Sequence, residues 1–240
     1  MCPAEHDILR AAEDRHWWYA VLHRLVQTEM QARVPVGSRV LDAGCGTGGM
    51  MAQLTKWDMH GLDIAPWAVR HCQKRGLHQV THASLHDLPF ETASFDAMLS
   101  LDVLYHEQVD EHNALREMAR VLKPGGLLIM NLPAFDCLRG AHDSAVCGAR
   151  RYTAAKVRER LRVHDLRVDV SHYWNAWLFL PMLLWRRWTR LYPDLARSDV
   201  RHLPVWLNSA LSGIGWLDAC ASRRLHLIGS SVFTVAHRHE

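Results

Sequence analysis

Short apolar runs alternate with longer segments of helical periodicity along most of this 240-residue chain. Apolar runs of strand length lie near Val40, Gly61, Val80, Ala97 and Leu128, and glycine or polar turn residues bound them. The segments between these runs have the length and apolar spacing of helices. This alternation predicts an α/β fold in which parallel strands are joined by right-handed crossovers.

The two ends of the chain add further elements to this core. A helix is predicted over residues 8–33, before the first strand. Residues 166–173 and 227–237 alternate apolar and polar positions well enough to be the last two strands. The pattern predicts a helical cap over residues 1–38, a core over 39–173 and 225–240, and an insertion over 174–224.

The insertion is unusual because about fifty residues stand where a short connection is common. Its first part is a dense apolar and aromatic run from Trp174 to Trp188, which also contains Pro181, a residue expected to kink or start a helix. The run is too short to span a bilayer, which takes about twenty apolar residues. It could be a lid over a hydrophobic substrate, an oligomer interface, an interfacial helix on a membrane, or simply core packed on the sheet.

The most informative stretch, VLDAGCGTGGM at residues 40–50, joins a buried strand to a glycine-rich turn. Glycines let the backbone turn tightly and approach a ligand closely, where a Cβ would collide. A helix predicted over residues 50–56 would direct its free amides into the same space. The stretch therefore predicts a nucleotide-cofactor pocket.

Asp42 decides between two cofactor classes that use such a turn. Read as G-x-G-x-x-G, Gly44, Gly46 and Gly49 also satisfy a dinucleotide fingerprint, which alone is weak evidence. A carboxylate just before the glycines would repel a pyrophosphate but suits an ammonium or sulfonium group. S-adenosylmethionine carries both cations. Asp63 ends the second strand where a ribose diol would lie, and it can accept from both hydroxyls.

Five motifs in order over roughly a hundred residues resemble the class I, Rossmann-like S-adenosylmethionine-dependent methyltransferases. They are D-x-G-x-G-x-G at residues 42–48, the strand ending at Asp63, and the segments 83–90, 95–106 and 115–132. The resemblance implies a seven-stranded, mostly parallel sheet flanked by helices, with an antiparallel last strand. Residues 16–19, 142–143, 150–152 and 228–232 also resemble a bacterial branch that acts on small molecules.

The resemblance carries a set of cofactor-binding positions onto this chain. One departure lies in the adenine-contacting loop, where the usual acid falls on Ser84 unless Asp87 substitutes from a shifted loop. Adenine recognition is then expected to rest on Leu85 and backbone groups. The N-terminal helix would close over the cofactor, with Tyr19 or Arg24 contacting the methionine carboxylate. The full set is Tyr19, Arg24, Asp42, Gly44, Cys45, Gly46, Asp63, Ile64, Ser84, Leu85 and Leu101.

Catalytic groups are harder to assign from the sequence. Methyl transfer from a sulfonium is an in-line displacement that depends mostly on alignment in a dry site, so a base is needed only where the nucleophile must lose a proton. Candidates are His106, His142 beside Asp143, and Tyr152. With seventeen histidines in the chain, each is more often a surface or structural residue.

Composition fits a soluble cytoplasmic enzyme. The N-terminal residues hold no apolar run of the secretory type, and six scattered cysteines without a C-x-x-C pair favour neither a disulfide framework nor a metal site. Residues 139–240 hold 16 Lys and Arg against 8 acids, a balance of +8 that leaves −5 for the rest. These arginines could attract an anionic substrate, through Arg150 and Arg151 for example, or lie on solvated helix faces.

The sequence thus predicts a methyltransferase that moves the methyl group of S-adenosylmethionine to an oxygen or carbon atom of a small, partly hydrophobic molecule, of the kind found in natural product biosynthesis. Alternatives are a cyclase triggered by methylation, and a catalytically silent scaffold or sensor that binds S-adenosylmethionine. No nucleic acid and no metal are expected. A homo-dimer through residues 174–224 is the expected assembly, and contact with a membrane surface is not favoured.

Overall fold

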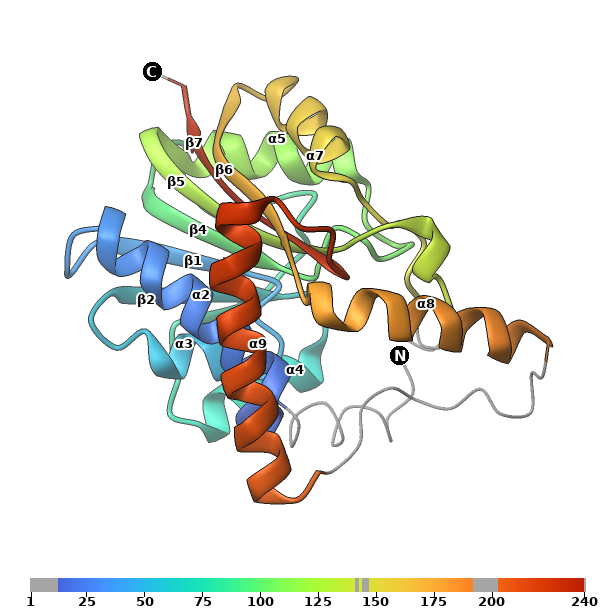
Figure 1. Ribbon diagram of the computed structural model, residues 1–240. Helices are drawn as coiled ribbons and strands as arrows, with labels where there is room; N and C mark the ends of the chain where they lie inside the picture. Colours follow the sequence, from blue (N-terminus) through green and yellow to red (C-terminus); the bar gives the residue numbers. More distant parts are fainter. Residues whose placement is uncertain (1–12, 141–142, 144–146, 192–202, 240) are drawn as a thin grey trace.

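The computed structural model describes residues 13–140, 143, 147–191 and 203–239. Within this part of the chain, seven strands form one sheet in the order β3-β2-β1-β4-β5-β7-β6 (Figure 1). The strands are β1 (Arg39–Ala43), β2 (Asp58–Asp63), β3 (Val80–His82), β4 (Phe95–Leu101), β5 (Leu122–Pro133), β6 (Leu166–Trp174) and β7 (Ser231–Arg238).

Strand direction separates the sheet into two parts. Strands β1 to β5 are paired in parallel, with β1 in the middle between β2 and β4. Strand β7 is antiparallel to both β5 and β6, and β6 forms the edge. The predicted fold class, a mostly parallel seven-stranded sheet with an antiparallel last strand, is therefore confirmed.

Helices cover both faces of the sheet, so the central strands are apolar throughout. Alternate residues of β5 belong to different cores: Leu127 and Ile129 pack on one face, and Leu128 and Met130 on the other. Helices α2 (Trp17–Arg33) and α9 (Val205–Leu225) contribute to the first core. Helices α5 (Glu111–Val121) and α7 (Ala154–Arg162) contribute to the second.

Three short helices follow the strands near the edge where parallel strands end. The helix after the glycine turn, α3 (Gly49–Gln53), begins one residue earlier and ends sooner than the predicted 50–56. Helix α4 (Pro66–Lys74) lies along β2 and β3, and the 3-10 helix η1 (Asp136–Leu138) follows β5. The predicted N-terminal helix over 8–33 appears as α2, and residues 1–12 lie outside the described residues.

Two helices are described between β6 and β7. Helix α8 (Ala176–Leu191) extends away from the end of β6, with Pro181 inside it, whereas α9 runs along α2 (Figure 1). The carboxylate of Asp218 in α9 accepts hydrogen bonds from the first amides of α8, those of Ala176 and Trp177, at 3.0 and 3.1 Å. No described helix is both long and apolar enough to cross a membrane.

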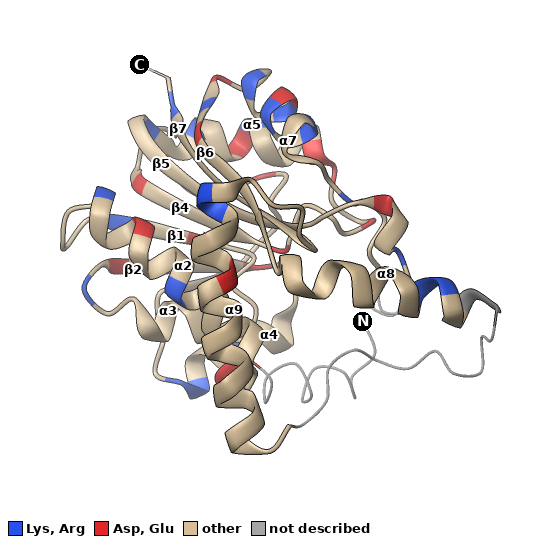
Figure 2. Ribbon diagram, viewed as in Figure 1, with Lys and Arg blue, Asp and Glu red and all other residues tan. Residues whose placement is uncertain are grey.

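Among the described C-terminal residues, many basic side chains lie next to acids. Lysine and arginine on α7 are mixed with acids, and most of α8 carries no charge until its C-terminal part (Figure 2). Several arginines are paired with acids from other elements, such as Arg223 with Glu29 of α2 and Arg160 with Glu111 of α5. The excess of arginine therefore lies largely on helix faces.

Gly229 tests how tightly the connection to β7 is packed. A Cβ at this position would lie 2.1 Å from the backbone oxygen of Trp174, an atom of the sheet edge that cannot move aside alone. We expect Gly229→Ala to lower the free energy of unfolding by about 2–3 kcal/mol, as overpacking does. Chemical denaturation followed by circular dichroism measures this change.

Gly213, in α9, is the matched control because a Cβ there would meet nothing within 4 Å. Gly213→Ala should stabilise the protein by up to about 1 kcal/mol through helix propensity. Equal stability of Gly229→Ala and the wild type would show that the segment before β7 is loosely held.

Candidate active site

A large cavity of about 990 Å³ opens at the carboxyl ends of the parallel strands. Its walls come from the turn after β1, the ends of β2, β4 and β5, the N-terminal helix, and α8. In open α/β sheets this edge binds ligands, because the strands on either side of the switch point lead their connections away from it. Here the switch point lies between β1 and β4.

The glycine turn after β1 contains three glycines with positive φ, Gly44, Gly46 and Gly48, and the first two line the cavity. Gly44 has φ +92°, and a Cβ there would lie 2.4 Å from the Val103 side chain. Gly46 has φ +54° with nothing within 4 Å of a Cβ, so its backbone lies open to the cavity. The turn therefore needs glycine at both positions, at Gly44 for close packing on Val103 and at Gly46 for its backbone conformation.

Asp63 closes this turn as well as facing the cavity. Its carboxylate accepts hydrogen bonds from the backbone amides of Gly46, at 2.9 Å, and Ala65, at 2.8 Å. Carboxylate oxygens have further lone pairs, so hydroxyls of a ligand can still be accepted. Burial raises the pKa of Asp63, although these amides act to lower it.

Asp42 is the least satisfied charge of the site. Its side chain is only 2% exposed and lines the cavity, and no described residue donates a hydrogen bond to its carboxylate. Burial, together with the charges of Glu13 and Asp63, raises its pKa to about 8. A buried carboxylate of this kind is stabilised by a cation.

A second acid lies at the end of the neighbouring strand. Asp102 follows β4, has φ +55°, and accepts a hydrogen bond from the Asn131 amide at 2.8 Å. Burial raises its pKa to about 7, against the lowering effects of Asn131 and Arg151. The segment 95–106 was singled out in the sequence for its position, but Asp102 itself was missed.

Glu13 is a third acid that sequence analysis did not find. It accepts a hydrogen bond from the amide of Gly49 at 3.1 Å and another from the Thr47 hydroxyl. Burial raises its pKa, with Thr47 and Arg75 acting to lower it. The residue lies before the predicted strands in a segment without a motif, so only the fold brings it to the glycine turn.

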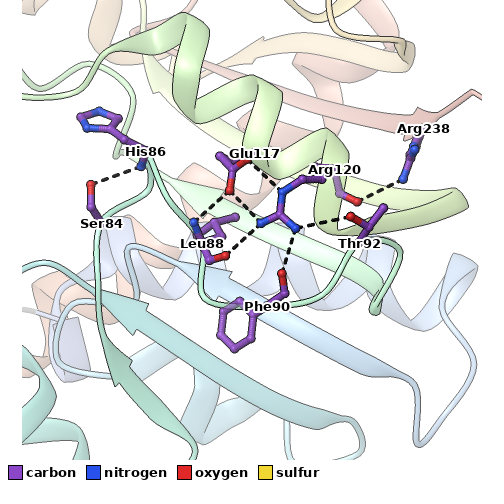
Figure 3. A network of polar contacts seen from close by, with 8 residues as sticks. All are labelled: Ser84, His86, Leu88, Phe90, Thr92, Glu117, Arg120 and Arg238. Atoms are coloured by element: carbon purple, nitrogen blue, oxygen red, sulfur yellow. Dashed lines mark hydrogen bonds and ion pairs between the residues drawn. The ribbon is translucent and has the colours of Figure 1, made fainter.

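The loop after β3 is held in place by an arginine on α5. Arg120 donates to the carbonyl oxygens of Leu88 and Phe90 at 2.9 Å, and Glu117 pairs with Arg120 and accepts from the Leu88 amide (Figure 3). These contacts place the start of the loop, Ser84 to His86, on the cavity wall. The adenine-contacting loop expected at this position is thus anchored from behind.

The expected cofactor-binding residues divide into two groups, those that line the cavity and one that does not. Most of the cofactor-binding positions line the cavity: Tyr19, Asp42, Gly44, Cys45, Gly46, Asp63, Ile64, Ser84, Leu85 and Leu101. Arg24 does not, because it lies on the exposed side of α2 with its guanidinium 4.0 Å from the Trp216 ring. The expected contact of Arg24 with a methionine carboxylate is therefore corrected.

The three candidate catalytic residues also separate. His106 lines the cavity and stacks on Tyr105, with ring centroids 4.2 Å apart. Tyr152 is 1% exposed in the core, where its hydroxyl donates to the Leu104 carbonyl at 3.1 Å, so it does not reach the cavity. The predicted catalytic role of Tyr152 is therefore corrected. His142 lies outside the described residues, and the neighbouring Asp143 pairs with Arg151 at 2.8 Å.

The consecutive N-terminal aromatics all reach the cavity. Trp18 stacks on Trp174, at 5.4 Å between centroids, and meets Tyr19 edge to face at 5.0 Å. Trp17 is buried and packs on Trp177 of α8, at 5.7 Å. These rings join the N-terminal helix to the insertion and form an apolar wall opposite the glycine turn.

Helix α8 supplies a part of the cavity that is far in sequence from the glycine turn. Leu178, Met182 and Arg186 line it from one face of the helix, and Asn175 lines it just before the helix begins. Sequence analysis assigned no role to Asn175, which follows a strand without any motif. Among the described residues no group of three or more His, Cys, Asp or Glu side chains could hold a metal ion.

The residues present fit S-adenosylmethionine. The orphan carboxylate of Asp42 and the nearby Asp102 suit its ammonium and sulfonium charges, and Asp63 beside the open backbone of Gly46 suits its ribose. Ile64, which is 62% exposed, and Leu85 offer apolar contact for adenine. A pyrophosphate would meet three buried acids instead.

Comparison with known proteins agrees with this geometry. Residues 41–130 match the model of the methyltransferase domain family. A dimethylglycine N-methyltransferase of Parasynechococcus marenigrum is 29% identical over 202 residues, covering 77% of this chain and 67% of that protein. A probable tRNA methyltransferase 9B of Mus musculus is 36% identical over 102 residues, but these cover 42% of this chain and only 23% of that protein.

Solved structures share the whole fold at low identity. The cyclase SpnF superposes with a TM-score of 0.59 and 22% identity, covering 90% of this chain and 80% of that one. Phosphoethanolamine N-methyltransferase 2 of Haemonchus contortus, in complex with S-adenosyl-L-methionine, gives a TM-score of 0.54 and 20% identity, covering 90% of this chain and 53% of that one. Residues 41–130 thus form a methyltransferase domain, and the fold of the chain is that of the class I, Rossmann-like S-adenosylmethionine-dependent methyltransferases.

Proposed function

We propose that this protein transfers the methyl group of S-adenosylmethionine to an oxygen or carbon atom of a small, partly hydrophobic molecule. The observation that carries the proposal is the buried carboxylate of Asp42 beside the glycine turn, to which no described residue donates a hydrogen bond. When bound, the cofactor supplies an electrophilic methyl group on a positively charged sulfur. The residues of this chain then bind it, align the acceptor and exclude water.

The acceptor side of the cavity supports a partly hydrophobic molecule. Trp17, Trp18, Leu178, Met182 and Leu203 line it, and they come from the N-terminal helix and the insertion. Ligand sites for small molecules are typically of this kind, mostly apolar with a few polar groups that fix orientation. The same contacts support the lid role proposed for the insertion, of which residues of α8 and Leu203 are described and line the cavity.

A proton acceptor is needed only for some acceptors. His106 lines the cavity and is held against Tyr105, so it is our candidate base. For a carbon nucleophile that is already electron-rich, the alignment of the two reacting atoms supplies most of the rate. We therefore expect loss of His106 to affect turnover more than cofactor affinity.

Two alternatives remain within the same fold. A cyclase that uses the same cofactor pocket is favoured by the likeness to SpnF, which at 22% identity extends to the fold alone. A scaffold that only binds S-adenosylmethionine would also keep Asp42, Gly44, Gly46 and Asp63. Transfer to tRNA is less well supported, because that relative matches over less than half of this chain.

A labelling experiment tests the proposal. The protein is incubated with S-adenosylmethionine carrying a labelled methyl group and with small-molecule extracts of its source organism. A labelled compound whose mass increases by one methyl group supports the transferase. Binding without turnover supports the scaffold, and no binding of S-adenosylmethionine contradicts the whole assignment.

Removal of the Asp63 carboxylate should weaken cofactor binding. Asp63→Ala takes away an acceptor for the ribose, the hydrogen bond to Gly46 that closes the glycine turn, and the hydrogen bond to the Ala65 amide. Hydrogen bonds to a charged group contribute about 1.5–3 kcal/mol, so the Kd should rise by about 10- to 100-fold. Isothermal titration with S-adenosylmethionine measures the Kd. The Kd of Asp63→Asn should fall between those of the wild type and Asp63→Ala.

Asp58→Ala is the matched control for that variant. Asp58 lies at the other end of the same strand, is exposed, and does not line the cavity. Its removal should leave the Kd for S-adenosylmethionine unchanged. An unaltered Kd in Asp63→Ala would show that the ribose lies elsewhere.

Cofactor affinity should rise with pH in a defined window. Because the pKa of Asp42 is raised to about 8, this carboxyl is mostly neutral at pH 6 and must lose its proton to pair with a cation. Affinity should therefore increase by about tenfold or more between pH 6.0 and 7.5. The upper limit of this pH window lies below the pKa of the cofactor's own amino group, which is about 7.7–8.0 for α-amines.

Asp42→Asn isolates the group responsible. The variant keeps the shape of the side chain but cannot ionise, so its affinity should be low and nearly independent of pH over the same window. Fluorescence or calorimetric titration at several pH values measures both proteins. An equally steep pH dependence in Asp42→Asn would show that the titrating group is Asp102 or the ligand, and not Asp42.

The exposed face of α8 bears on assembly. Leu180 and Leu184 are each 60% exposed and Trp185 is 45% exposed, and they lie together on the helix. We propose that this face forms a homo-dimer contact. Leu184→Glu should then raise the dimer Kd by about tenfold or more, as measured by analytical ultracentrifugation.

Val163→Glu serves as the control for assembly, because Val163 is also exposed, at 66%, but follows α7 instead. It should leave the dimer intact. A protein that is monomeric at every concentration tested would exclude the dimer.

A further inference from the structure

We propose that the methyl acceptor is an elongated amphipathic molecule that carries an anionic group held by Arg186 and, at its other end, a hydrogen-bonding group held by Asn175. The inference rests on the proposed function, because it names the class of acceptor for the same cavity. It follows from one face of α8 and from two buried polar side chains at the ends of that face.

Asn175 is a buried amide without partners. Its side chain is 0% exposed, it lines the cavity, and neither its Nδ2 nor its Oδ1 bonds to any described residue. An amide in this state loses free energy unless a ligand supplies the missing donor and acceptor. Its φ of +60° comes from the turn between β6 and α8, so the backbone sets its position.

Asn175 stands near the acidic, cofactor-facing part of the cavity. It follows Trp174, whose indole nitrogen donates to Asn131 at 2.9 Å, and Asn131 in turn donates to Asp102 at 2.8 Å. A hydroxyl or other polar group held by Asn175 would therefore lie near the methyl donor. Asn175 can both donate to and accept from such a group.

The face of α8 that follows is apolar and then cationic. Leu178, Met182 and Arg186 are spaced by four residues, so they line one side of the helix and all three reach the cavity. At 1.5 Å per residue, Leu178 and Arg186 lie about 12 Å apart along the helix axis. This spacing favours an extended apolar chain or ring system between two polar ends.

Arg186 is a buried cation at the distal end. It is 3% exposed and lies against Gly140, where a Cβ would meet its side chain at 2.4 Å. Arg151 and Asp143, which are also buried and line the cavity, form an ion pair nearby. Arg186 lowers the pKa of Asp143, so it lies close enough to influence charge there. A planar guanidinium among these groups suits a carboxylate.

Binding of three simple probes tests the anionic end. The wild-type protein is titrated with octanoate, octanol and octylamine, which share a chain but differ in charge, and bound S-adenosylmethionine is kept saturating. We expect octanoate to bind at least tenfold more tightly than octanol, with octylamine the weakest. Equal affinity for octanoate and octanol would overturn the inference.

Two variants of α8 locate the charge. Arg186→Met should weaken octanoate binding by about tenfold or more, the value of one charged hydrogen bond, and leave octanol binding unchanged. Arg187→Met is the matched control, since Arg187 is the exposed neighbour on the same helix. Equal losses in the two variants would overturn the inference, because a general charge effect would explain both.

A third variant tests the other end. Wild-type protein should bind 8-hydroxyoctanoate several-fold more tightly than octanoate, and Asn175→Gly, which keeps the positive φ, should abolish that difference alone. If Arg186→Met does not fold, Arg186→Lys keeps the charge and should retain the preference for octanoate over octanol.

Affinity for S-adenosylmethionine, measured separately in each variant, should stay at the wild-type value. A wild-type protein that does not bind S-adenosylmethionine would contradict the proposed function. A wild-type protein that binds S-adenosylmethionine but does not prefer octanoate to octanol would contradict this inference only.

Discussion

A buried negative charge at the end of the first strand governs the rest of this structure. Asp42 lies at the carboxyl end of β1, at the switch point of the sheet, with no described donor to its carboxylate. Glu13, Asp63 and Asp102 are half-buried around the same cavity, and their partial burial raises the pKa of each. Gathering acids in one cavity costs free energy unless a cation compensates them, and S-adenosylmethionine brings two positive charges.

The scaffold that holds these acids is rigid because both faces of the sheet are covered. Each acid follows a strand or is hydrogen-bonded to the glycine turn, so it cannot move without moving the core. The loop expected to contact adenine is tied to α5 through Arg120 (Figure 3). Preorganised groups of this kind bind a ligand without first being ordered.

The insertion between β6 and β7 gives the cavity its second half. Helix α9 packs on α2 and caps the start of α8 through Asp218, and α8 in turn presents an apolar face that ends in Arg186. The cofactor side of the cavity is therefore built by the parallel strands and the turns that follow them, while the acceptor side is built by the N-terminal helix and the insertion.

The sequence by itself determined the core of this protein. Local patterns of apolar residues predicted the strands and their direction, and the glycine turn with Asp42 and Asp63 predicted the cofactor pocket, because these features depend on neighbours close in the chain. The site roles predicted for Tyr152 and Arg24 were wrong, because the residues that these side chains contact, Leu104 and Trp216, are distant in sequence.

Only the tertiary structure decided which side chains share the cavity. Glu13, Asp102, Asn175 and Arg186 come from three segments far apart in the chain, and no motif pointed to any of them individually. Their roles arise from burial and from contacts between elements, and a linear pattern contains neither.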